Sequence, residues 1–204
     1  MKKIICIGDS IRMGYEPTVV TELEGWADVV ELKDLQCDNT RVVLEHLGEW
    51  LSDDLDVVHI LDVVHINAGL HDMAQDPCAD PAVPPDGERR VPLEDYRTNL
   101  AKIFEIIGST TKARIIFGLT TPVDLQRQHS SGKGLHRTTE DVATYNTVAS
   151  DVAAQHGVTI DDLNKVVADH GAAQMLKEDG VHFTDEGSAV LGRAVAAAIR
   201  EVAS

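Results

Sequence analysis

The sequence predicts an α/β domain in which helices cover both faces of a central parallel β-sheet. Short runs rich in Val, Ile and Leu alternate along the chain with longer segments of helical spacing. Strands that are separated by helices pair in parallel, because the intervening helix returns the chain to the same end of the sheet. The runs are also apolar almost throughout, which is typical of parallel strands that are buried on both faces.

Five strands and four helices are expected from this alternation. Apolar residues recur every three or four positions in residues 92–108, as on one face of a helix. The segment 138–157 opens with a capping pattern, Thr138 to Asp141, and closes on Gly157. The expected strands are residues 3–8, 28–33, one copy of the phrase LDVVHI, 113–120 and 158–163, and the expected helices are residues 40–51, 92–108, 138–157 and 184–202.

Composition favours one globular domain over residues 1–204. The chain is 43% hydrophobic and 25% charged, and its length suits a single core. The net charge of −16 argues against nucleic acid and anionic membranes as partners, because both would repel an acidic surface. No apolar run has the length of a signal peptide core or a membrane span. The three cysteines Cys6, Cys37 and Cys78 fit neither a disulfide framework nor a zinc spacing, so a reducing cytoplasm is the expected location.

The loops that follow the strands are where chemistry is expected, because sites in parallel sheets form beyond the carboxyl ends of the strands. The first strand ends in Gly8-Asp9-Ser10, and Asp179 and His182 precede the last helix. A serine hydroxyl needs a general base to become a nucleophile, and the base needs a partner that fixes its tautomer. Asp179 and His182 are spaced to play those parts for Ser10. Taken singly, Gly-Asp-Ser is also an ordinary turn, and Asp-x-x-His a solvated helix cap.

A third segment, Gly69-Leu70-His71-Asp72 after the third strand, completes a pattern that resembles the SGNH/GDSL hydrolase family. The resemblance covers the chain from residue 4 to about residue 200, with the blocks in the right order. It implies a flavodoxin-like, three-layer α/β/α fold with a central, mostly parallel five-stranded sheet. It also implies ester hydrolysis through an acyl-enzyme, without metal or other cofactor, on a small acyl ester or a carbohydrate-linked acetyl ester. The family's nucleophile maps to Ser10, its acid to Asp179 and its base to His182.

Two positions depart from the family pattern. The third block usually reads Gly-x-Asn-Asp, with the Asn amide in the oxyanion hole, and His71 stands in place of that Asn. A histidine N–H can also donate there, so the predicted oxyanion donors are His71 and the backbone N–H groups of Ser10 and Cys37. Cys37 stands where the family has a glycine. Both departures also suit an alternative reading, a folded but catalytically inactive binding or scaffold protein.

Arg12 and residues 124–137 have two interpretations each, and several other segments have one. Arg12 either meets an acidic group of the substrate or forms a salt bridge on the surface. Residues 124–137 form either a flexible lid or a solvated linker, and residues 76–92 are expected to wrap the rim. His59 and His65 occupy repeated strand positions and are read as structural. A metal site made of His71, Asp72, Asp179 and His182 is disfavoured, because no pair has a zinc-site spacing on a helix.

The phrase LDVVHI occurs twice in tandem, at residues 55–60 and 61–66. Deleting either copy leaves a complete helix end, strand and loop, so we interpret the repeat as a six-residue duplication. Because six is even, either copy buries the same side chains in the sheet. The second copy leads directly into the segment with Gly69 to Asp72, with no extra residues between them, so it is expected in the sheet. The first copy is then displaced, exposing Val57, Val58 and Ile60, and the sequence predicts a homodimer or exchanged arrangement through that segment.

Overall fold

The structure is a computed structural model that describes residues 1–30, 37–51, 60–76, 87–131 and 135–204. Its sheet has five parallel strands in the order β2-β1-β3-β4-β5, so β3 lies at the centre. This is the strand order of flavodoxin-like folds, and it confirms the predicted fold class. The strands are β1 Lys2–Ile7, β2 Ala27–Val30, β3 Val63–Asn67, β4 Arg114–Gly118 and β5 Thr159–Asp161.

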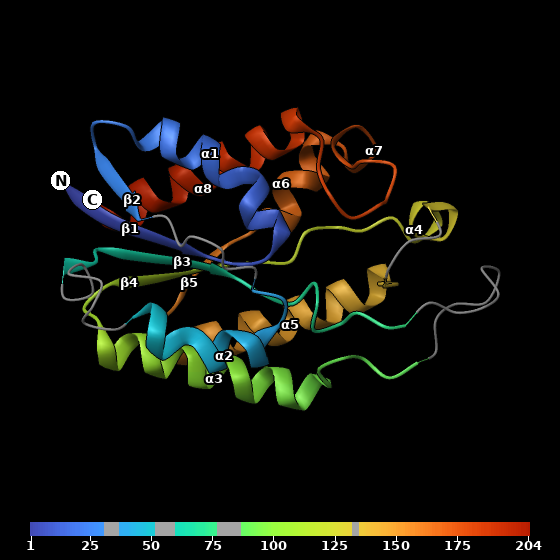
Figure 1. Cartoon of the computed structure of the whole chain (residues 1–204), viewed down its shortest axis with the longest axis horizontal. Coiled ribbons are helices and arrows are strands. Elements are labelled where there is room, and N and C mark those ends of the chain that lie inside the picture. Colours follow the sequence, from blue (N-terminus) through green and yellow to red (C-terminus); the bar gives the residue numbers. More distant parts are fainter. Residues whose placement is uncertain (31–36, 52–59, 77–86, 132–134) are drawn as a thin grey trace.

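Helices cover both faces of the sheet, which gives three layers (Figure 1). One layer holds α1 Ser10–Leu23, α6 Leu163–His170, α7 Ala172–Met175 and α8 Asp185–Ala203. The opposite layer holds α2 Thr40–Trp50, α3 Leu93–Thr110 and α5 Thr139–His156. The short helix α4 Leu125–Ser131 lies beyond the sheet, at the end where the strands finish.

All four predicted helices are present, and their caps follow the sequence signals. The Thr138 hydroxyl accepts from the Asp141 N–H at the start of α5, and Gly157 closes that helix with a φ of 66°. Thr184 likewise caps α8 by accepting from the Gly187 N–H. A positive φ favours glycine because it has no Cβ, so the position after α5 suits Gly157.

Helices α1, α4, α6 and α7 were not among the predicted elements. Helix α1 contains Gly14 and Pro17, two residues that disfavour a helix interior, so its sequence gives a weak helical signal. The segment read as a lid or linker is partly helical, because residues 125–131 form α4. Most of residues 76–92, predicted to wrap the rim, lie outside the described part of the chain.

The central strand comes from the second copy of the duplicated phrase, as predicted. Backbone hydrogen bonds tie Asp62 to both neighbouring strands: its N–H donates to the Lys3 carbonyl, and its carbonyl accepts from the Arg114 N–H, both at 2.9 Å. Leu61 is buried, whereas Ile60, the last residue of the first copy, is 54% exposed. Residues 55–59 lie outside the described residues.

The core fills both interfaces between the sheet and its helices. Every residue of β3 is buried, as expected for a central parallel strand. None of the helices described by the structure is long and apolar enough to cross a membrane. The largest fully buried side chains are Tyr15, Tyr96, Phe117, Ile4, Ile5, Ile7, Leu23, Leu47, Ile66, Met73, Leu100 and Ile103.

Candidate active site

Ser10 is the first residue of α1, directly beyond the carboxyl end of β1. Asp9 is the N-cap of this helix, and its carboxylate accepts the Ile11 N–H at 2.9 Å. The first N–H groups of a helix have no partner within it, so the Ser10 N–H lacks an intrahelical acceptor. The same end of the helix carries partial positive charge. Ser10 is therefore presented where a developing negative charge would be stabilised.

Asp179 and His182 lie in the turn between α7 and α8. Asp179 Oδ1 accepts the backbone N–H groups of Val181 and His182, both at 2.9 Å, and Asp179 Oδ2 lies 2.8 Å from His182 Nδ1. Burial raises the pKa of Asp179, but these hydrogen bonds outweigh it and hold the pKa below its usual value. Asp179 is therefore an anion that fixes the orientation of the imidazole.

The turn needs a glycine at position 180. Gly180 has a φ of 73°, and a Cβ there would lie 2.3 Å from the Asp124 carbonyl oxygen. This close approach lets the Asp124 N–H donate to the Gly180 carbonyl at 2.8 Å. The turn that carries His182 is thereby held against the start of α4.

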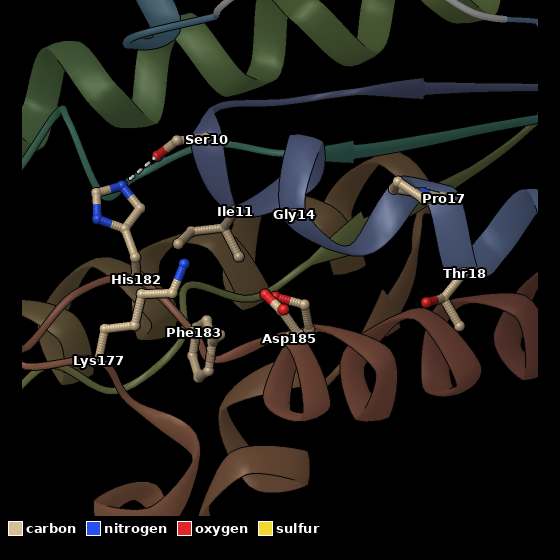
Figure 2. Close-up of a pocket in the computed structure, with 10 residues that line it drawn as sticks. Ser10, Ile11, Gly14, Pro17, Thr18, Lys177, His182, Phe183 and Asp185 are labelled. Atoms are coloured by element: carbon tan, nitrogen blue, oxygen red, sulfur yellow. Dashed lines mark hydrogen bonds between the residues drawn. The ribbon is translucent and has the colours of Figure 1, made fainter.

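The fold brings the serine and the histidine together across 172 residues of sequence. Ser10 Oγ lies 2.9 Å from His182 Nε2, and the imidazole points at the hydroxyl (Figure 2). With the contact to Asp179, this gives an unbroken Ser10–His182–Asp179 hydrogen-bond chain. The three residues predicted to act together are thus linked by hydrogen bonds, with His182 between Ser10 and Asp179.

A cleft of about 350 Å³ opens beside the Ser10–His182 pair, between α1 and the segment that leads into α8 (Figure 2). The cleft is open to solvent at His182, whose side chain is 45% exposed. Apart from Ile11, Pro17 and Phe183, its lining is polar or small. The lining residues are Ser10, Ile11, Gly14, Pro17, Thr18, Lys177, His182, Phe183, Asp185 and Ser188.

His71 lies in the turn after β3, and its Nδ1 is buried without a hydrogen-bond partner among the described residues. Burial lowers the pKa of His71, and the Asp9 carboxylate opposes that effect. The ring is therefore neutral near pH 7 and carries one N–H. The charge of the Asp9 carboxylate therefore acts on this ring.

Cys37 does not offer the free N–H expected of it. Its backbone N–H donates to the Gly8 carbonyl at 3.3 Å, so this donor already has an acceptor within the protein. Burial raises the pKa of the Cys37 thiol to about 12, so the side chain is a neutral thiol rather than a nucleophile.

Arg12 is buried in α1. Its guanidinium forms an ion pair with Glu16 one turn along the helix, and the two side chains are 5% and 12% exposed. The salt bridge foreseen for Arg12 therefore forms, but in a buried setting and not on the surface. The contact between Arg12 and a substrate stays a prediction.

Sequence reasoning missed several buried residues around Ser10. Asn67, the last residue of β3, donates from its amide to Asp9 Oδ1 at 3.1 Å. Arg137 donates from Nε to the Leu70 carbonyl at 2.6 Å and so anchors the turn that carries His71. Asn67 stands beside the quoted Gly69 block and could have been noticed there, whereas no local pattern marks Arg137.

The disfavoured metal site is not assembled by these residues. Asp72 Oδ1 accepts both the N–H and the hydroxyl of Thr40, so Asp72 ties the turn after β3 to the start of α2. Asp179 is engaged with His182 instead. Asp72 and Asp179 are thus each engaged in contacts within the protein.

Comparisons with known proteins agree with the fold and the motifs. The GDSL-like Lipase/Acylhydrolase family model matches residues 6–190. A lipase/acylhydrolase from Enterococcus faecalis is similar in structure, with 23% identity and a TM-score of 0.77 over 98% of this chain and 96% of that one. An acetylxylan esterase from Geobacillus stearothermophilus has 20% identity and a TM-score of 0.71 over 98% and 94% of the two chains.

A member of the lipolytic protein G-D-S-L family from Veillonella parvula DSM 2008 has 19% identity and a TM-score of 0.68, and 96% of each chain is covered. No curated protein matched the chain. The structural likenesses concern the fold, whereas the family model extends over nearly the whole sequence. The chain belongs to the GDSL-like lipase/acylhydrolase family and is a hydrolase of the esterase/acylhydrolase type.

Proposed function

We propose that the protein is a serine esterase that cleaves a small acyl ester, such as an acetyl ester carried by a carbohydrate, through an acyl-enzyme. The observation that carries the proposal is the Ser10–His182–Asp179 chain, with contacts of 2.9 and 2.8 Å. Its order of hydroxyl, imidazole and carboxylate is that of an activated serine nucleophile.

In this mechanism Ser10 Oγ attacks the ester carbonyl carbon while its proton passes to His182 Nε2. Asp179 stabilises the imidazolium that forms. The bond from the carbonyl carbon to the alcohol oxygen then breaks, and His182 returns the proton to the departing alcohol. Water, activated by the same imidazole, hydrolyses the acyl-enzyme and restores Ser10.

The oxyanion is held by the Ser10 N–H and the His71 ring N–H. The Ser10 N–H belongs to the unpaired first turn of α1. The neutral His71 ring, on the turn after β3, would supply one further donor. The Cys37 N–H takes part only if it leaves the Gly8 carbonyl.

The cleft between α1 and α8 supports a polar alcohol part for the substrate. Thr18, Ser188, Asp185 and Lys177 offer hydroxyl, carboxylate and ammonium groups along it. Such groups pair with sugar hydroxyls, and the three apolar lining residues, Ile11, Pro17 and Phe183, offer little surface for a long acyl chain. The likeness in fold to an acetylxylan esterase agrees with this substrate class.

The nucleophile is tested with a fluorophosphonate probe and p-nitrophenyl acetate. The probe should label Ser10, and Ser10→Ala should abolish both labelling and hydrolysis. Ser109→Ala removes an exposed hydroxyl on α3 and serves as the matched control with full labelling. A folded wild-type protein whose Ser10 stays unlabelled would overturn the esterase proposal and favour an inactive binding protein.

The substrate class is tested by comparing acetylated xylo-oligosaccharides with p-nitrophenyl decanoate. Asp185→Ala should raise KM for the acetylated sugar and leave p-nitrophenyl acetate hydrolysis unchanged. Glu186→Ala removes an acidic residue from the same first turn of α8 but outside the cleft, so it controls for the helix dipole. A preference for the decanoate ester would contradict the carbohydrate assignment.

A further inference from the structure

A chain of buried hydrogen bonds runs from the end of β5 to the residue before Ser10. Asp161 Oδ2 lies 3.1 Å from His65 Nε2, and His65 Nδ1 lies 3.3 Å from the Tyr15 hydroxyl. The Tyr15 hydroxyl lies 2.9 Å from Asn67 Oδ1, and Asn67 Nδ2 lies 3.1 Å from Asp9 Oδ1. All five residues are buried, with exposures between 0% and 8%.

The direction of these hydrogen bonds follows from which groups can donate. Asp9 Oδ1 already accepts the Ile11 N–H, so it acts as an acceptor toward Asn67 as well. Asn67 must therefore turn its NH₂ group to Asp9 and its oxygen to Tyr15. Tyr15 has a single proton, which it donates to Asn67. Only its oxygen lone pairs then face the imidazole, so His65 Nδ1 carries a proton.

The far end of the chain holds His65 in this state. His65 Nε2 lies 3.1 Å from Asp161 Oδ2, and this contact orients the ring so that Nδ1 faces the Tyr15 hydroxyl. The chain thus has one polarity from Asp161 to Asp9, and reversing any link would leave a buried group unpaired.

We propose that Tyr15 is a positioning residue. His65 holds the Tyr15 hydroxyl, which orients Asn67, and Asn67 in turn orients the Asp9 carboxylate. Asp9 caps the first turn of α1, which carries Ser10. The role rests on the proposed esterase function of Ser10. Tyr15 itself does not touch the reacting atoms, because Asn67 and Asp9 stand between. It acts by keeping Ser10 Oγ in line with His182, where small displacements cost large factors in rate.

The pKa of Asp9 provides a second way to test the hydrogen-bond chain. Burial raises the pKa of Asp9, while His71, the Ile11 N–H, the Asn67 amide and Arg137 lower it. If Asn67 is no longer held, its amide stabilises the carboxylate less, and the pKa of Asp9 rises further. The acid limb of the rate profile should then move to higher pH.

Tyr15→Phe is compared with Tyr145→Phe, which removes another buried hydroxyl. The Tyr145 hydroxyl donates to the Val91 carbonyl at 2.6 Å and has no link to Asp9. We expect Tyr15→Phe to lower kcat for p-nitrophenyl acetate by roughly tenfold, with KM within about twofold. The acid limb of the pH–rate profile should also shift to higher pH. Tyr145→Phe should change neither, although it also loses a buried hydrogen bond.

A measurement independent of catalysis keeps the proposal separate from the esterase assignment. The Ile11 amide bonds to Asp9, so its ¹H–¹⁵N resonance should shift in Tyr15→Phe and stay in place in Tyr145→Phe. Equal kcat in the two variants, or an Ile11 resonance that does not move in Tyr15→Phe, would overturn the role of Tyr15. Absence of probe labelling at wild-type Ser10 would instead overturn the esterase proposal. The Ile11 resonance would still test the hydrogen-bond chain between Tyr15 and Asp9.

Discussion

His71 is the residue on which the proposed oxyanion hole depends most. It is neutral near pH 7 because burial lowers its pKa, and it lies on the turn after β3. We expect His71→Ala to lower kcat by roughly 10²–10³-fold with little change in KM, because the donor acts on the oxyanion and not on the ground state. His71→Asn should restore part of the loss, since an amide also donates. If steady-state kinetics show no change in kcat for His71→Ala, backbone N–H groups alone hold the oxyanion.

Asp72 should make the free energy of unfolding depend on pH. Burial raises its pKa to about 6, and its Oδ2 has no partner among the described residues. Because the folded protein holds this proton more tightly than the unfolded chain, Asp72 contributes least stability above pH 6, and stability rises as pH falls toward 4. Asp72→Asn keeps an acceptor for Thr40 without the charge. Urea unfolding should show a gain of about 3 kcal/mol at pH 8 that shrinks toward pH 5, and a pH-independent difference would contradict the shift.

At the scale of elements, the duplicated phrase places a testable constraint on β3. The second copy is bonded to both β1 and β4 and leads directly into the turn with His71. Six additional residues would extend a strand by roughly 20 Å, more than a strand of normal length accommodates. We propose that residues 55–60 are an insertion that the site does not need. Deleting them should leave esterase activity intact or improved, and loss of activity in a folded deletion variant would contradict this.

The elements themselves were predictable to different degrees. Strands β1, β3, β4 and β5 and helices α2, α3, α5 and α8 have strong local signals, such as apolar runs, periodicity and the caps Thr138 and Thr184. Helix α1 has no such signal, because Gly14 and Pro17 disfavour it. It forms because it packs against α8, where Gly192 approaches Thr18 so closely that a Cβ would lie 2.5 Å away. Tertiary packing here overrides propensity.

At the scale of the whole molecule, the duplication predicts association. Ile60 is 54% exposed, and the remainder of the first copy includes Leu55, Val57 and Val58, apolar residues that suit a strand. Such a segment favours pairing with a second chain, so we propose a homodimer or exchanged arrangement through residues 55–60. Light scattering should give a dimer mass for the full chain and a shift toward monomer for the deletion variant. The same mass with and without the six residues would refute this.

The sequence by itself determined the α/β class and most of the strands and caps, and it singled out Ser10, Asp179 and His182 as candidate catalytic residues. These features rest on local patterns or on motifs in which residue type and order carry the information. Only the tertiary structure decided that Arg12 faces Glu16, that the Cys37 N–H bonds to Gly8, and that Asp161, His65, Tyr15, Asn67 and Asp9 form one chain. Asp161 and His65 lie 96 residues apart. Which buried polar groups meet depends on how strands and helices dock, and each must find a partner once water is excluded.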